Sequence, residues 1–449
     1  IIEYKIESSN FDTTIWSGEN DKQTGFVTLQ TFAKDYYGIC KVTGVYSATS
    51  ATATVIRALY TNGSSVAATN DFALSPWSAA NGYPGTVGFF EDRLIFAGSK
   101  KYPQTYWASK NGDYYNFGTS IPSADDDAVT GTLNNGQMNG IKAIVTFSQM
   151  LMQTAGGSYL VGSGNDPLTY KNQQSKPQEY RGINDLTPCV IGSRIVFVQQ
   201  QGNSVRDIGY DYNNDKYQGD DVSLLATHLF EGRQIVSMTY QQIPNSTVWC
   251  VRDDGVLLGM TYIKEQDVYA WHRHSTQGKF IDVCSISGDN EDELWAVVYR
   301  NGSYYVELMG SQIQGEEPAD QFYLDCGVQV TGNTGKTISG LTWLNGLQVQ
   351  ILADGNVLPV QTVTGNAIAL DNVYKTVSIG LGYKSRLQTL PIDFNGNDGT
   401  YASRKKRVTK LMVMFKASRG GTYGVNEKNM DEIKWRSNEP WNTPISLYT

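Results

Sequence analysis

Short apolar runs separated by turn residues dominate the chain, and apolar positions with the 3.6-residue period of a helix are almost absent. The runs are rich in Val, Ile, Tyr, Phe and Thr, which favour strands, and Gly, Asn and Asp interrupt them every few residues. Residues 248–251 lead through Asp254-Gly255, a hairpin signal, into residues 256–260, and residues 294–299 turn at Asn301-Gly302. The pattern predicts an all-β protein.

Strand–turn–strand hairpins also recur with a regular spacing. A short apolar strand precedes each hairpin, and these leading strands begin at residues 86, 143, 189, 235 and 281. The intervals are therefore 57, 46, 46 and 46 residues. Repeats of about 40–50 residues with three or four strands each are typical of β-propeller blades. A row of β-sandwich hairpins with accidental spacing is the alternative, and the three equal intervals favour the propeller.

The two flanks differ from this middle region. Residues 1–80 are rich in Ser, Thr and Ala, which favours a β-rich arm or a small β-domain over a deep core. Residues 311–320 have the polar composition of a linker, and strand-like runs resume after it. We expect a β-propeller-like domain over residues 81–310, and small β-sandwich or β-barrel-like domains on both sides, the second over residues 311–449.

Composition and charge exclude several classes of protein. Of the 449 residues, 36 are Lys or Arg and 44 are Asp or Glu, so the net charge is 36 − 44 = −8. A protein that reads nucleic-acid sequence would present a basic face instead. No apolar run approaches the ~18 residues of a membrane span, and the longest runs, such as residues 411–415, have the length of a strand. The first residues also lack the apolar core of a secretory signal.

The cysteines indicate a reducing compartment. Five cysteines, an odd number, are dispersed along the chain, which fits neither a disulfide framework nor the close pairs of a zinc site. Most of them have apolar neighbours, and we therefore interpret them as small buried hydrophobic residues. They are Cys40, Cys189, Cys250, Cys284 and Cys326.

Motifs that carry catalytic or metal chemistry fail at required positions. His272 and His274 would lie on one face of a strand, but no third ligand is near them in sequence. The turn that starts at Asp211 lacks the Gly and Glu of an EF-hand, and residues 332–337 lack the first glycine of a P-loop. With three histidines, a nucleophilic triad has few candidate bases. We expect no catalytic residue, no cofactor and no metal.

Two charged groups leave alternatives open. Residues 125–127 and 289–293 are rich in carboxylates that a glycosidase could use, although acidic surface turns are commoner. Residues 404–407, Arg-Lys-Lys-Arg, form a basic run in an otherwise acidic chain. This run is either the solvated entrance of a strand over residues 408–415 or a patch that docks on an acidic subunit face.

Several blocks of the sequence resemble one family. Residues 82–118 contain a Gly-Tyr-Pro start, then Arg-Leu-Ile-Phe-Ala-Gly, Pro-Gln-Thr, Trp-Ala-Ser and Gly-Asp-Tyr-Tyr-Asn-Phe. Further blocks occur in the same order over residues 251–274, 291–302, 346–359 and 380–391. Together they resemble the tail nozzle, or tail tubular protein B-like, proteins of short-tailed, podovirus-type bacteriophages.

The resemblance implies a structural virion protein of the phage tail that is not an enzyme. Such a protein would be made in the bacterial host cytoplasm and would form a homo-oligomer, expected to be a hexamer. Its ring would contain a β-propeller and lie below the portal-adaptor (head-tail connector) protein, with tail fibre or tail tip proteins as further partners. Genomic DNA would pass through the bore during ejection into the host, without specific binding and without a membrane span in the protein.

A carbohydrate-binding or depolymerising tail protein that contacts the host surface is the alternative function. Propellers host both lectins and glycosidases, and Trp side chains can stack on sugars. Core packing explains the same tryptophans, because they lie within or beside the expected strands. They are Trp107, Trp249, Trp271, Trp295 and Trp343.

Overall fold

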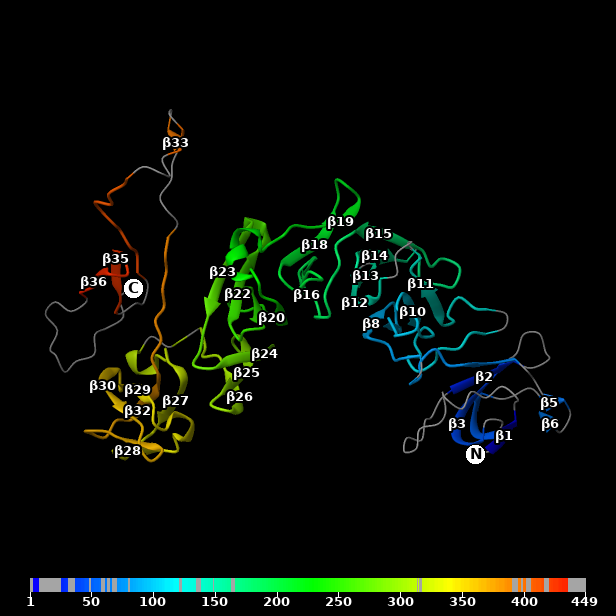
Figure 1. The fold of residues 1–449 in the computed structure, drawn as a ribbon, viewed down its shortest axis with the longest axis horizontal. Helices are drawn as coiled ribbons and strands as arrows, with labels where there is room; N and C mark the ends of the chain where they lie inside the picture. The colour runs from blue at the N-terminus through cyan, green and yellow to red at the C-terminus, as the bar shows by residue number, and fades with distance from the viewer. Residues whose placement is uncertain are drawn as a thin grey trace. The chain divides into compact units, whose positions relative to one another are not determined.

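A computed structural model provides the structure of the chain. It describes residues 3–7, 26–30, 37–47, 50–57, 61–62, 65–66, 71–79, 81–120, 123–134, 139–147, 149–162, 166–312, 314, 317–389, 395–396, 399–400, 405–415 and 420–434. Figure 1 shows that strands joined by turns and loops make up nearly all of them. The helical elements among these residues are 3₁₀ turns, namely η1 (Leu224–Leu229), η2 (Lys264–Gln266), η3 (Pro318–Asp320) and η4 (Thr342–Leu344).

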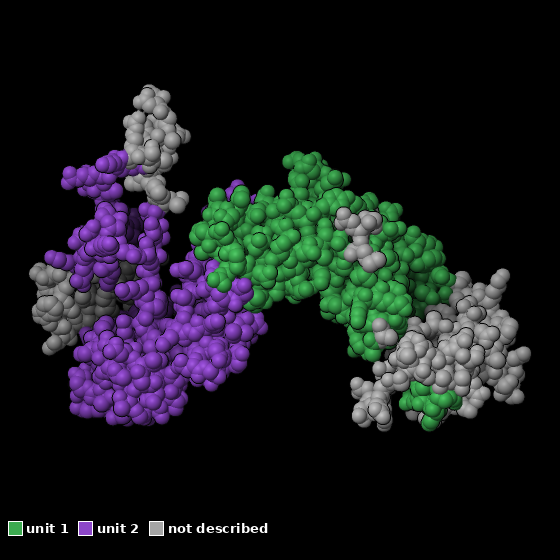
Figure 2. Space-filling view, viewed as in Figure 1, with its two compact units in different colours: residues 1–238 green, residues 239–449 purple. Residues whose placement is uncertain are grey.

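The chain divides into two compact units, residues 1–238 and residues 239–449 (Figure 2). The first unit begins with an antiparallel five-stranded sheet in the order β1-β4-β3-β2-β7. Alternate residues of its two longest strands are buried, including Cys40, Val42, Ala51 and Ala53. The strands of this region are β1 (Glu3–Glu7), β2 (Phe26–Gln30), β3 (Tyr37–Ser47), β4 (Ser50–Arg57), β5 (Thr61–Asn62), β6 (Ser65–Val66) and β7 (Asp71–Leu74).

Three four-stranded antiparallel sheets follow, each built from strands that are consecutive in sequence. Apolar residues from neighbouring sheets share a core: Ile95 and Tyr106 pack with Met150 and Met152, for example. The strands are β8 (Thr86–Phe90), β9 (Arg93–Ala97), β10 (Thr105–Ala108), β11 (Val129–Thr132), β12 (Ile141–Thr146), β13 (Met150–Thr154), β14 (Ser158–Val161), β15 (Ser175–Glu179), β16 (Cys189–Ile191), β17 (Arg194–Val198), β18 (Val205–Asp211) and β19 (Lys216–Gln218).

Two more sheets of the same kind continue the series. The fourth has four strands, its first strand containing the boundary between the units, and the fifth has three. Trp249 and Leu257 of the fourth sheet pack against Leu294 of the fifth. The strands are β20 (Ile235–Gln241), β21 (Thr247–Arg252), β22 (Leu257–Ile263), β23 (Val268–His274), β24 (Lys279–Ser287), β25 (Asp292–Arg300) and β26 (Ser303–Leu308).

The turn between β25 and β26 fixes the register of the last hairpin. Asn301 and Gly302 both have positive φ angles, of 46° and 85°. Two consecutive residues with positive φ define a type I′ turn, which the Asn-Gly sequence favours. Arg300 and Ser303 therefore close the hairpin as a directly opposed pair.

A further sheet in the second unit has the order β27-β32-β29-β30 and is accompanied by the β28-β31 pair. Its core includes Leu344, Val349, Ile351 and Ile379. The strands are β27 (Asp325–Thr331), β28 (Thr337–Ser339), β29 (Gln348–Ala353), β30 (Asn356–Thr362), β31 (Ala367–Ala369) and β32 (Thr376–Leu381). The hairpins β33 (Asn395–Gly396) with β34 (Gly399–Thr400), and β35 (Thr422–Asn426) with β36 (Asn429–Glu432), follow.

The sequence prediction of the fold class is confirmed: the protein is all-β, with a β-propeller-like series of blade-like sheets and additional small β-domains. The leading strands expected near residues 86, 143, 189, 235 and 281 correspond to the first strands of the five sheets, β8, β12, β16, β20 and β24. The domain boundaries at residues 80 and 310 stay predictions.

The prediction of a strand over residues 408–415 is wrong. Residues 408–415 have the apolar composition of a strand, but the structure assigns residues 405–415 to no strand. A strand requires a neighbour for its backbone hydrogen bonds, and composition alone does not supply one. Of the basic run before it, residues 405–407 are exposed and Arg404 lies outside the described residues.

Candidate functional site

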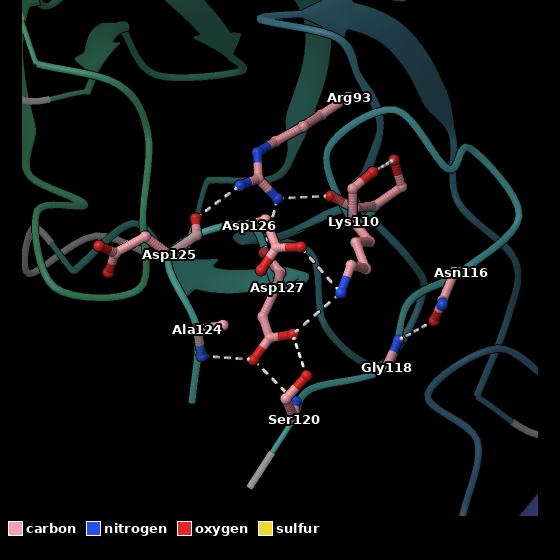
Figure 3. A network of polar contacts seen from close by, with 10 residues as sticks. Arg93, Lys110, Asn116, Gly118, Ser120, Ala124, Asp125, Asp126 and Asp127 are labelled. Carbon is pink, nitrogen blue, oxygen red and sulfur yellow. Dashed lines mark hydrogen bonds and ion pairs between the residues drawn. The ribbon is translucent and has the colours of Figure 1, made fainter. Parts of the chain in front are cut away.

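The first blade-like sheet carries a buried polar network around Arg93 (Figure 3). The Arg93 side chain is 2% exposed. Its Nη1 donates hydrogen bonds to the carbonyl oxygens of Ser109, at 2.7 Å, and Asp127, at 2.6 Å, and its Nη2 donates to that of Asp125, at 3.1 Å. One guanidinium therefore ties β9 to the residues after β10 and to the loop before β11.

Asp127 closes the same loop from its other side. Its carboxylate accepts hydrogen bonds from the backbone N–H groups of Ser120, at 2.7 Å, and Ala124, at 2.8 Å, and from the Ser120 hydroxyl, at 2.7 Å. Burial alone would raise the pKa of Asp127, but these hydrogen bonds and the charge of Lys110 lower it below its ordinary value. Asp127 is thus held ionised as an anchor of the loop.

The three carboxylates of residues 125–127 have different main partners. Asp126 forms an ion pair with Lys110 at 2.9 Å, and Asp125 lies 3.3 Å from the ammonium group of Lys171. The Asp127 carboxylate is engaged by the loop itself. This arrangement explains the acidic run by local structure.

The second unit contains a recess beside the histidine pair. His272 and His274 lie on the same face of β23, as the sequence predicts, and His272 Nδ1 is 2.7 Å from His274 Nε2. Burial lowers the pKa of His272, and burial together with the neighbouring His272 lowers the pKa of His274 to about 4. Both rings are therefore neutral at pH 7 and share a hydrogen bond.

The recess has a volume of about 510 Å³ and is lined by apolar, amide and imidazole groups. The buried Trp249 ring lies 5.5 Å from His272 and 5.2 Å from His274, centroid to centroid. Gln242, Asn245 and Gln312 also face it. In the part of the chain that the structure describes, no group of three or more His, Cys, Asp and Glu side chains has the geometry to hold a metal.

An acidic recess of about 610 Å³ lies at one end of the fifth sheet. Its walls come from residues 289–294 and from residues 308–312, which follow β26. The Asp292 carboxylate accepts from the backbone N–H of Gln242 at 2.7 Å, and the Glu291 carboxylate from that of Gln312 at 3.2 Å. The second acidic run of the sequence thus forms a concave anionic surface.

The two failed ligand motifs are turns in the structure. Asp211, at the end of β18, accepts a hydrogen bond from the backbone N–H of Asn213 at 2.9 Å, as expected of an Asp/Asn turn. Asn333, between β27 and β28, donates to the carbonyl oxygens of Gly335 and Tyr374, both at 2.8 Å. No helix follows Asn333 before β28, and a P-loop requires one.

The tryptophans considered for sugar stacking differ in exposure. Trp107 and Trp249 are buried, at 6% and 2% exposure, so neither offers a ring face to solvent. Trp343 packs against the core of the C-terminal sheet and donates to the Cys326 carbonyl oxygen at 3.1 Å. Trp271 and Trp295 are half-buried on β23 and β25. Core packing therefore accounts for the first three.

The expectation that the cysteines are buried is partly wrong. None of the five cysteines is in a disulfide. Cys40 and Cys250 are buried, Cys189 and Cys326 are half-buried, and Cys284 is exposed. Val283 faces the core, so the alternation of the strand turns Cys284 to the opposite side. The apolar neighbour that suggested burial for Cys284 thus explains its exposure.

The fifth sheet also has an uncovered apolar face, which the sequence reading missed. Tyr304, Val306 and Leu308 on β26 are 69%, 71% and 47% exposed. The alternating pattern of β26 predicted the strand, but it did not show which of its faces lacks a neighbour. One signal was present: the polar residues 311–320 follow β26 where the preceding sheets have a fourth strand.

Comparison with known proteins adds no family. No protein-family model and no curated protein matches the chain. Among solved structures, a protein from Lactobacillus plantarum covers 79% of this chain and 99% of its own, with 7% identity and a TM-score of 0.32. "YCF48 bound to D1 peptide" covers 68% and 85%, with 12% identity and a TM-score of 0.32. BamB from Moraxella catarrhalis covers 68% and 88%, with 10% identity and a TM-score of 0.26.

Matches with such low TM-scores carry no argument about what this protein does. The description of the fold depends instead on the strand order of the sheets. Among the described residues, no helix is long and apolar enough to cross a membrane.

Proposed function

We propose that the protein is a structural subunit of a bacteriophage tail nozzle, a ring through which the genome passes into the host. The resemblance of the ordered sequence blocks between residues 82 and 391 to the nozzle family suggests the tail. The main structural support for a function in assembly is the uncovered apolar face of the fifth sheet, formed by Tyr304, Val306 and Leu308. Contiguous exposed apolar residues on a folded protein mark surfaces that bind other proteins.

Several features support subunit association over catalysis. Two exposed tyrosines belong to the apolar face, Tyr304 on β26 and its cross-strand neighbour Tyr299 on β25. Aromatic residues are enriched in protein interfaces. A closed ring requires two different complementary surfaces on each subunit. The acidic recess and the basic residues 405–407 are candidates for such a pair, because their charges are opposite.

The net charge is consistent with a conduit for DNA. Six copies with a charge of −8 each would carry 6 × −8 = −48. A basic wall would bind the duplex through the release of counterions, whereas an acidic wall repels it and lets it move. In this proposal the subunit contacts the portal-adaptor above it and tail fibre or tail tip proteins below, within the virion.

Sedimentation velocity combined with electron microscopy of the purified protein tests the proposal. We expect rings with a central hole, most simply hexamers. Val306→Asp should weaken their assembly, because it places a charge on the apolar face, whereas the control Val360→Asp, on an exposed position of β30, should not. A protein that remains monomeric with its adaptor present would contradict the nozzle, and a slender trimer would favour a fibre.

Carbohydrate chemistry is the competing outcome. A glycan array and an assay for reducing sugar released from host polysaccharide would detect it. Reproducible hydrolysis that is lost when one carboxylate of residues 289–293 becomes an amide would replace the nozzle proposal with the depolymerising alternative.

A further inference from the structure

The fifth sheet ends in an open edge. The four preceding sheets of the series have four strands each, whereas this one has three, and β25 is the strand that pairs with β26 among the described residues. Arg300 and Ser303 form the hydrogen-bonded pair that closes the type I′ turn. In antiparallel pairing, Tyr304, Val306 and Leu308 must therefore direct their backbone groups away from β25, toward this edge.

An open edge of this kind can accept a strand. Unpaired backbone donors and acceptors in a row form a template for pairing with another chain. The side chains of Tyr304, Val306 and Leu308 lie on the uncovered face, while Glu307 and Tyr305 lie on the side of Ala296 and Val298. An incoming strand should thus be apolar on the face that it shares with Tyr304, Val306 and Leu308. On the other face it would lie beside Glu307, whose carboxylate accepts from Arg300 at 2.7 and 2.8 Å.

Residues 405–415 have the corresponding pattern. The structure assigns them to no strand, and Leu411, Met412, Val413 and Met414 are exposed, Met412 by 83%. A segment rich in Val, Leu, Met and Phe rarely stays exposed to water when the edge of a sheet is available to pair with it. Basic residues at positions 405–407 and Lys410 precede or interrupt the apolar stretch.

Charge selects the direction of pairing. The acidic recess lies at the carboxyl end of β26, where residues 308–312 meet residues 289–294. A strand antiparallel to β26 would place its amino end there. For residues 405–415, this end is the basic one. Antiparallel pairing, the arrangement of every neighbouring strand in the series, therefore brings residues 405–407 to the acidic recess.

We propose that residues 405–415 of one copy of this chain add to β26 of a neighbouring copy as the fourth strand of its fifth sheet. The pairing is antiparallel, with Val306 opposite Leu411 and Tyr304 opposite Val413. In this register Glu307 lies opposite Lys410. Residues 405–407 then extend past Leu308 to the acidic recess.

The donated strand and the receiving edge are different surfaces, so the contact is heterologous and can repeat from copy to copy until a ring closes. The choice of a second copy as donor rests on the proposed function, which requires such a contact. Opposed pairs of this kind stabilise a sheet through apolar and opposite-charge contacts.

Site-specific cross-linking tests the register and the donor together. Two differently tagged copies are expressed together, one with Val306→Cys and the other with Leu411→Cys, both in a Cys284→Ser background because Cys284 is exposed. A short bis-methanethiosulfonate reagent bridges the ~5.5 Å between the Cα atoms of a hydrogen-bonded pair. We expect a cross-link between the two tags.

The matched control replaces Leu411→Cys with Met412→Cys, whose side chain would point to the other face of the donated strand. Met412 is more exposed than Leu411, 83% against 60%, so random collision would cross-link it at least as well. Equal yields at the two positions would overturn the strand pairing. A third sample carries Val306→Cys and Leu411→Cys on the same chain. If only this sample cross-links, the donated strand comes from the same chain and not from a second copy.

Charge reversal gives an independent measurement. Lys405→Glu with Arg407→Glu should weaken association by roughly tenfold, whereas Lys384→Glu with Lys428→Glu, the same change of charge at other exposed positions, should not. Rings that assemble without the 306–411 cross-link would overturn this inference and leave the nozzle proposal in place. If the 306–411 cross-link forms in an assembly that never closes into a ring, the nozzle proposal is contradicted and the pairing of residues 405–415 with β26 is supported.

Discussion

Replacing Arg93 with Met should loosen the loop that Figure 3 shows around Asp127. Met keeps much of the apolar volume of the side chain but removes three donated hydrogen bonds, to the carbonyl oxygens of Ser109, Asp125 and Asp127. Each buried acceptor left without a partner costs about 1–3 kcal/mol. Because water can reach the exposed Asp125, we expect a total loss of about 3–5 kcal/mol for Arg93→Met.

Hydrogen exchange measured by mass spectrometry is the suitable assay, since a chain with two compact units need not unfold in one step. Peptides that contain Ser120 and Ala124, whose amides donate to Asp127, should exchange much faster in Arg93→Met. Lys110→Met is the matched control, because Lys110 is a partly exposed cation of the same network and should change exchange little. Unchanged exchange in Arg93→Met would refute the reasoning.

Three other outcomes are expected. The pKa of His274 is lowered from 6.5 to about 4, so the free energy of unfolding should fall as the pH drops between these values, and a urea titration of His274→Phe should show a smaller fall. A Cβ at Gly131 would lie 2.4 Å from the buried Tyr106 ring, so Gly131→Ala should lower the free energy of unfolding by about 1–3 kcal/mol and shift the urea midpoint down, unlike Gly140→Ala, whose nearest contact is 3.5 Å. Cys284 should react with iodoacetamide faster than the other four cysteines, as peptide mapping would show.

Local signals in the sequence were sufficient for the series of sheets. The Asn301-Gly302 turn, for instance, has the positive φ angles that its composition favours. The leading strands were found because apolar runs bounded by turn residues recur at nearly constant spacing. These features depend on neighbours within a few residues, so a single sequence contains them.

Features that depend on distant partners could not be predicted in this way. Nothing near Asp127 in sequence shows that Arg93 would reach its carbonyl oxygen across 34 residues. The strand expected at residues 408–415 failed for the same reason, because its composition is suitable but pairing depends on another segment. The exposure of Cys284 followed from which face of β24 meets the fourth sheet.

The consecutive order of strands within each blade-like sheet bears on how the chain acquires its structure. Each of the five sheets has all the strands that it takes from the described chain once its own segment has left the ribosome, because none of these strands comes from a distant part of that chain. The shared cores, such as that of Ala143 and Leu151 with Ile195 and Phe197, form when the next segment follows. Such short sequence separations keep the entropy of loop closure small. The sheets can therefore form in order during synthesis, before the C-terminal region exists.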